Sequence, residues 1–196
     1  MTSGTTLTFV PLCPLVTWAV DVADQAQAIG RRGDVALPLA AALEARAHAL
    51  LHDERRARDA LTRAEANLAH LEGEALMPSA FGYNEAQLRF HAGNAHTHLH
   101  NTEAAMNAQD QALRLCAPGD YTDQVLTQLD RATCLLHDRD VSSALGTAND
   151  ALRALDDAQR VGIISARAHE LLKDVPADAR GLPLARDLVE VLASTR

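Results

Sequence analysis

Apolar residues recur at three- and four-residue steps along most of the chain, and residues typical of turns interrupt this pattern at short intervals. The spacing predicts amphipathic helices, because residues three and four apart lie on one face of a helix. Prolines, glycines and capping Asp or Asn residues delimit nine such segments, at about Trp18–Arg31, Leu37–Leu51, Asp53–Leu71, Asn84–Leu99, Asn101–Leu115, Tyr121–Leu136, Asp140–Ala158, Ile163–Lys173 and onward from Pro183. The short turns between them predict that neighbouring helices are antiparallel.

Small residues follow a fixed spacing in three successive pairs of predicted helices. In each pair the second small residue comes 12 positions after the first and the third a further 7 positions on, at Ala45, Ala57 and Ala64, at Gly93, Ala105 and Ala112, and at Ala132, Ala144 and Ala151. Small side chains on facing helices allow the two backbones to approach closely. The spacing therefore predicts three tandem helical hairpins.

This pattern resembles the tetratricopeptide repeat, in which pairs of antiparallel helices stack into a superhelix. Two features depart from the family. The repeats are 48 and 39 residues apart instead of about 34, so the linkers at 72–83 and 116–120 are enlarged. In addition, His52, His100 and Arg139 occupy the turn position at which the family usually has glycine. The resemblance implies an all-α, tetratricopeptide-like helical-hairpin superhelix, or solenoid, of about nine helices.

The composition agrees with an all-α fold. The chain has 38 Ala and 29 Leu, which favour helices, but only 14 Val and Ile together and 6 aromatic residues. Sheets need β-branched and aromatic residues to cover their pleated faces. We therefore expect an extended segment at residues 1–16 and one helical repeat domain at residues 17–196, whose length allows a stable core without disulfides or metals.

The first predicted helix lacks a partner. Its Ala19 and Ala26 are seven residues apart, as in the second helix of each hairpin, but no first helix precedes it. An unpartnered helix exposes an apolar edge, here at Trp18, Val22 and Ile29, and monomers rarely leave such a patch open. We therefore expect a homodimer formed through this helix.

A second resemblance covers residues 17–193. The phrases EARAHALLHDERRARDALTRAEANL, SAFGYNEAQLRFHAGNAH, ISARAHELLKD and PLARDL occur in an order similar to that of the carboxy-terminal repeat half of bacterial helix-turn-helix transcriptional regulators. The resemblance implies a module that senses a ligand or binds a protein or peptide, linked to transcriptional regulation. Only about 16 residues precede the first predicted helix, so we expect no DNA-binding half in this chain.

Charge and cysteine content narrow the function classes. The 18 basic and 26 acidic residues give a net charge of −8, and the basic residues form no cluster, which argues against direct binding of nucleic acid. The three cysteines, Cys13, Cys116 and Cys134, form no disulfide or zinc pattern, and a reduced cytoplasm fits them. The apolar run at residues 7–20 contains two prolines and follows no basic residue, so we expect neither a signal peptide nor a membrane span.

Candidate binding residues follow from the repeat alignment. In the tetratricopeptide family the first helix of each pair lines the concave groove, and the resemblance places His98 and His137 at equivalent groove positions. Only Arg46 and Asn94 suit the binding of a carboxylate, and protonation of His98 and His137 below about pH 6 would favour anions further. The expected ligand-binding groove comprises Arg46, Phe90, His91, Asn94, His98, Thr133 and His137.

Catalysis and metal binding find less support. His96 and His100 share a helix face, but His98 points away from it and no third ligand is obvious, so we expect no metal and no cofactor. Cys134 and His137 have a spacing compatible with a thiolate pair, although a cysteine in such a helix is more often a small core residue. We expect no catalytic residue. The alternative is a repeat scaffold that binds or transforms a small molecule with His91, His98 and His137.

Overall fold

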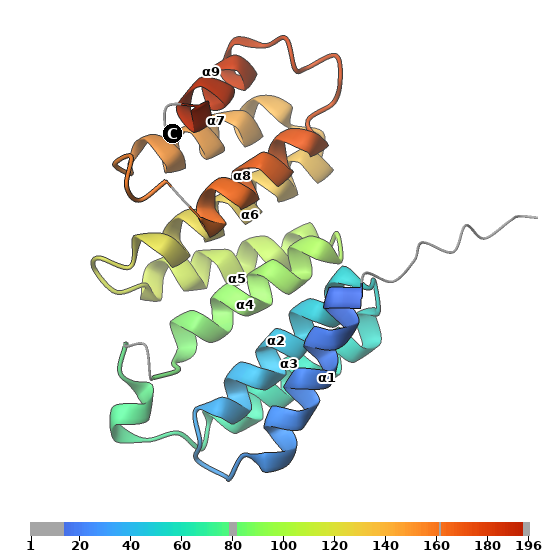
Figure 1. Cartoon of the computed structure of the whole chain (residues 1–196), viewed down its shortest axis with the longest axis vertical. Coiled ribbons are helices and arrows are strands. Elements are labelled where there is room, and N and C mark those ends of the chain that lie inside the picture. The colour runs from blue at the N-terminus through green and yellow to red at the C-terminus, as the bar shows by residue number, and fades with distance from the viewer. Residues whose placement is uncertain (1–13, 79–81, 161, 194–196) are drawn as a thin grey trace, which may run out of the picture.

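The computed structural model describes residues 14–78, 82–160 and 162–193, and all secondary structure within these ranges is helical (Figure 1). The expected all-α class is therefore confirmed for the described residues. The α-helices are α1 (Pro14–Ile29), α2 (Ala36–Leu50), α3 (Glu54–Leu68), α4 (Glu85–His98), α5 (Thr102–Leu115), α6 (Tyr121–His137), α7 (Val141–Arg153), α8 (Ile163–Asp174) and α9 (Pro183–Ala193), and a short 3₁₀ helix, η1, spans Gly73–Leu76.

Side-chain caps fix the beginnings of five helices. In each case a carboxylate or amide oxygen accepts a hydrogen bond from the backbone N–H three residues later, which satisfies a donor that the helix itself leaves free. The capping residues are Asp53, Asn84, Asn101, Asp120 and Asp140. At Asn84 the Gln87 side chain also bonds back to the backbone of the cap, which completes a capping box.

Some helix ends differ from the prediction. Helix α1 begins at Pro14, so the last three residues of the expected extended segment belong to it, and residues 1–13 lie outside the described residues. Helix α7 ends at Arg153 instead of Ala158 because Arg160 donates hydrogen bonds to the carbonyl groups of Leu152 and Leu155. These bonds satisfy helix carbonyls that a further turn would otherwise have used.

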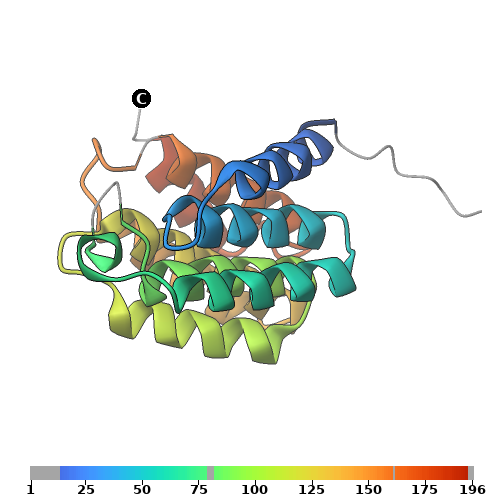
Figure 2. The same ribbon diagram turned by 90° about the horizontal axis from the view of Figure 1, so that it is seen from below.

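The helices form pairs that follow one another along the long axis of the molecule (Figure 1). Helix α2 packs against α3, α4 against α5 and α6 against α7. The first helices of these pairs also contact each other, because α4 touches both α2 and α6, and α6 touches α8. Helix α1 packs on α2 at the outside of the assembly (Figure 2).

The predicted small residues lie where helices cross, and all nine are buried. Gly93 shows the constraint most directly. A Cβ added there would lie 3.0 Å from Cγ of Gln109, closer than nearly all real contacts allow. The small-residue spacing thus identified the close helix approaches correctly.

The turns inside the three hairpins have a left-handed residue that is not glycine. His52, His100 and Arg139 have φ values of 55°, 57° and 62°. This conformation costs a residue with a Cβ about 1–2 kcal/mol. The same turn therefore recurs in all three hairpins, at the positions where the sequence replaced the expected glycine.

The apolar core is largest at the carboxy-terminal end. There α6, α7, α8 and α9 share one cluster that includes the fully buried Leu129, Leu145 and Leu188. Two smaller clusters, rich in alanine, lie among α2, α3, α4 and α5. None of the helices in the described part of the chain is long and apolar enough to cross a membrane.

Candidate functional site

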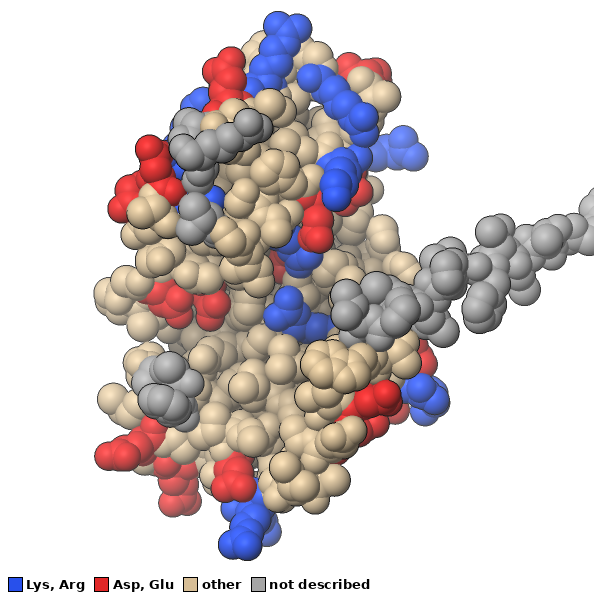
Figure 3. Space-filling view, in the orientation of Figure 1, with Lys and Arg blue, Asp and Glu red and all other residues tan. Residues whose placement is uncertain are grey.

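A cavity of about 700 Å³, which we call the central groove, opens along α2, α4, α6 and α8. It brings together five of the seven predicted residues, and α8 adds charged residues that the sequence argument missed. The predicted residues are Arg46, Asn94, His98, Thr133 and His137, and the charged residues from α8 are Arg167, Glu170, Lys173 and Asp174. On the face seen in Figure 3, basic side chains lie near the middle, between the surface of α1–α3 and that of α6–α9.

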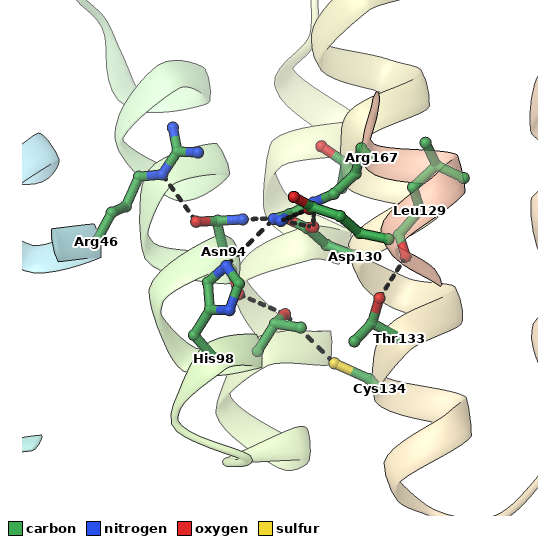
Figure 4. Close-up of polar contacts among 12 residues, drawn as sticks. Arg46, Asn94, His98, Leu129, Asp130, Thr133, Cys134 and Arg167 are labelled. Atoms are coloured by element: carbon green, nitrogen blue, oxygen red, sulfur yellow. Dashed lines mark hydrogen bonds and ion pairs between the residues drawn. The ribbon is translucent and has the colours of Figure 1, made fainter. Parts of the chain in front are cut away.

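A chain of hydrogen bonds crosses the groove from α2 to α8 (Figure 4). Nε of Arg46 donates to Oδ1 of Asn94 at 2.7 Å, and Nδ2 of Asn94 donates to Oδ2 of Asp130, also at 2.7 Å. Nε of Arg167 donates to Oδ1 of Asp130 at 2.9 Å. Asp130 is 2% exposed, so its carboxylate is a buried charge that Asn94 and Arg167 satisfy.

Arg46 differs from Arg167 in having no counter-charge. Arg167 forms ion pairs with Asp130 and Glu170. Arg46 contacts neutral groups, because Nε bonds to Asn94 and Nη1 donates to Nδ1 of His91 at 3.2 Å. No carboxylate of the described residues lies within ion-pairing distance of it, and burial lowers its pKa. Arg46 is therefore a partly buried cation without an anion.

His91 and His98 act as acceptors for these arginines. Nη2 of Arg167 lies 3.3 Å from Nε2 of His98. Because arginine is always a donor, both imidazoles accept and are neutral. Burial, followed by the neighbouring Arg46 charge, lowers the pKa of His91 to about 3, and burial with Arg167 and Arg46 lowers that of His98 to about 4. The expected charging of His98 near pH 6 is therefore wrong.

His137 belongs to a row of three imidazoles at one edge of the groove. Its ring stacks on His100 with centroids 3.9 Å apart, and His100 lies 6.1 Å from His52. Burial and His100 lower the pKa of His137. His98 and His137 line the same groove, but the ring that contacts His137 is that of His100.

The remaining predicted residues take supporting places. Phe90 is buried and lies under the Arg46 guanidinium, whose Cζ is 5.7 Å from the ring centroid. His91 is buried beside Phe90, with ring centroids 5.1 Å apart. The hydroxyl of Thr133 donates to the carbonyl of Leu129 on its own helix. Phe90 and His91 thus support Arg46 from below and do not line the central groove.

Two important groove residues escaped the sequence argument, although signals for both exist. Arg167 lies 34 residues after Thr133, the length of a regular tetratricopeptide repeat. Asp130 lies 39 residues after His91, the distance between the second and third hairpins. Continuing the repeat alignment to these positions would have placed both residues in the groove.

The structure favours neither thiol nor metal chemistry here. Cys134 is fully buried, Gln109 donates to its Sγ at 3.7 Å, and Thr97 Oγ1 lies 3.4 Å from the same atom. Burial raises the pKa of this thiol, so it is no activated nucleophile. Among the described residues, no group of three or more His, Cys, Asp or Glu side chains is arranged to hold a metal ion.

Comparison of the chain with protein-family models, with curated proteins and with solved structures found no match. The chemistry of the central groove is therefore the basis of the function proposed below. Its main elements are one cation without a counter-charge, a fixed amide, and imidazoles that stay neutral at physiological pH.

Proposed function

We propose that this chain is a tetratricopeptide-like interaction module that binds an acidic segment of a partner protein in the central groove. We further propose that it is catalytically inert, acts in the cytoplasm and is linked to transcriptional regulation, as its resemblance to repeat halves of transcriptional regulators suggests. The three hairpins with matching small-residue crossings and matching left-handed turns support the repeat assignment. The position of Arg167 on α8 extends the same periodicity.

The observation that carries the proposal is the unpaired charge of Arg46. Removing a guanidinium from water without a counter-charge is costly, and an incoming carboxylate would recover that cost through charge-assisted hydrogen bonds. Asn94 cannot turn freely, because Asp130 holds its amide nitrogen and so directs its oxygen at Arg46. The cation is thus held in place before any ligand arrives, which lowers the entropy cost of binding.

An acidic peptide fits this groove better than a nucleic acid or a phosphate-rich surface. Arg46 is a single unpaired cation, whereas Arg167 already has two carboxylate partners. Glu170 and Asp174 also line the groove and would repel a polyanion. One or two carboxylates separated by neutral positions match this distribution of charge.

A small molecule is the alternative occupant. The volume of about 700 Å³ lies within the range of small-molecule sites. Neutral His98 and His137 at its wall offer hydrogen-bonding nitrogens to a polar ligand. Mass spectrometry of small molecules released from the purified native protein distinguishes the two occupants, since a retained metabolite favours the alternative and its absence, together with peptide binding, favours the protein partner.

Arg46→Gln tests the proposal. The substitution removes the charge and keeps a side chain that can still bond to Asn94, so we expect affinity for acidic peptides to fall at least tenfold. Binding is measured by isothermal titration calorimetry against an array of acidic peptides, and Arg55→Gln is the matched control because Arg55 is exposed on α3 away from the groove. Equal affinities of the wild type and Arg46→Gln would contradict the proposal.

A further inference from the structure

A second cavity lies beside the central groove and was not anticipated from the sequence. It measures about 660 Å³ and is bounded by α4, α5, the first turns of α6 and all five residues of the enlarged linker 116–120. We call it the linker cavity. Its walls are largely apolar, with Phe90, Leu113 and Leu115 among them, and no Lys, Arg or His is among its described lining residues.

The linker cavity contains one carboxylate without a partner. Glu85 pairs with Arg89, and Asp120 caps α6 by accepting from the backbone N–H of Asp123. The Asp123 carboxylate itself forms no hydrogen bond or ion pair with any residue that the structure describes. Burial and the neighbouring Asp120 raise the pKa of Asp123 to about 6. Asp123 is thus a half-buried acid that lacks a cation.

Asp123 and Arg46 are connected through Phe90. The ring of Phe90 lines the linker cavity together with Asp123, and the Arg46 guanidinium lies over the same ring. The two charges are near enough for each to shift the pKa of the other, yet they form no ion pair. The concave face therefore presents an unpaired cation and an unpaired anion on either side of one aromatic ring.

We infer that Asp123 binds a Lys or Arg side chain of the same partner segment whose carboxylate binds Arg46, so that the module selects peptides carrying both charges. This inference rests on the proposed function. A Lys or Arg side chain suits the linker cavity because its methylene stem can lie along Phe90, Leu113 and Leu115 while its charged head meets Asp123. Two opposite charges at a fixed separation also impose order and spacing on the bound sequence.

Short capped peptides test the inference. The series is acetyl-Lys-(Ala)n-Glu-amide with zero to four alanines, in both sequence orders, because each extended residue adds about 3.3–3.6 Å between the charges. Each peptide has a partner in which Gln replaces Lys. Affinities for the intact chain come from ¹H–¹⁵N chemical-shift titrations, which also report whether each protein variant is folded.

We expect one spacing at which the Lys peptide binds wild type about five- to tenfold more tightly than its Gln partner. Asp123→Asn should abolish this preference and leave the affinity for the Gln peptide unchanged. Asp178→Asn, at an exposed carboxylate between α8 and α9, should keep the preference. Arg46→Gln should weaken both peptides.

The outcomes separate the two proposals. If Lys and Gln peptides bind equally at every spacing and order while Arg46→Gln weakens both, the inference is wrong and the proposed function stands. If Asp123→Asn keeps the preference for Lys, the cation binds elsewhere and the inference is again wrong. If no acidic peptide binds, or binding ignores Arg46→Gln, the proposed function fails and the inference fails with it.

Discussion

At the scale of single residues, burial decides which charges this molecule carries. Nine histidines suggested a groove that gains positive charge in mild acid, but desolvation and two arginines hold His91 and His98 neutral. The same desolvation leaves Arg46 charged, because the pKa of a guanidinium starts so high that lowering it does not neutralise the group. The groove therefore offers a fixed cation, and its histidines serve as acceptors that orient it.

The buried histidines predict a loss of stability in mild acid. The folded state lowers the pKa of His91 to about 3 and that of His98 to about 4, below the value of 6.5 for a free histidine. The unfolded chain thus binds more protons below pH 6.5, and stability present above that pH is lost as the pH falls. We expect each histidine to remove about 1–2 kcal/mol from the free energy of unfolding between pH 6.5 and 5.

Urea denaturation of the wild type and His91→Gln across this pH range measures the effect. Asp123 acts in the opposite sense, because its pKa is raised to about 6 and the folded state accepts its proton more readily. The difference between wild type and His91→Gln isolates the histidine from this contribution. We expect His91→Gln to have a shallower pH dependence, whereas His169→Gln, at an exposed position on α8, should follow wild type. Parallel curves for all three proteins would show that His91 does not bind protons differently on folding.

At the scale of elements, the sequence predicted helices and caps well but could not predict contacts between turns. Periodicity and capping are local properties, so Asp53, Asn101 and Asp140 were recognisable as helix starts. The stacking of His100 on His137 depends on how two hairpins pack, which no local pattern encodes. Tertiary position likewise decides that Arg46 lacks a carboxylate while Arg167 has two.

The left-handed turns predict a stabilising substitution. Arg139 has φ 62° and its exposed side chain has no recorded contact among the described residues, so Arg139→Gly should relieve backbone strain without losing packing. We expect the free energy of unfolding to rise by up to about 1 kcal/mol, measured by urea denaturation. His100→Gly should gain less, because it removes the ring that stacks on His137. A lower stability for Arg139→Gly than for wild type would contradict this account of the turn.

At the scale of the whole molecule, α1 is the element with the least support. It packs on α2, and its Gln27 bonds to the buried carboxylate of Glu44, which Arg63 from α3 also contacts. This polar contact anchors one side of the helix. The opposite side exposes Trp18 at 64% and Ile29 at 84% of their surface, as the unpaired-helix prediction expected.

The exposed face of α1 predicts self-association. Trp18, Val22 and Ile29 are spaced four and seven residues apart, so they form one apolar stripe along the helix. A second copy with the same stripe would cover it by a two-fold arrangement in which each α1 packs on the other. We expect a dimer by sedimentation velocity, and Trp18→Glu should convert it to a monomer because it places a charge in the centre of the contact. Leu182→Glu is the matched control, since Leu182 is 42% exposed just before α9, and it should leave the dimer intact. A wild-type chain that remains monomeric at all concentrations, or a dimer that Trp18→Glu does not weaken, would show that α1 does not form the interface.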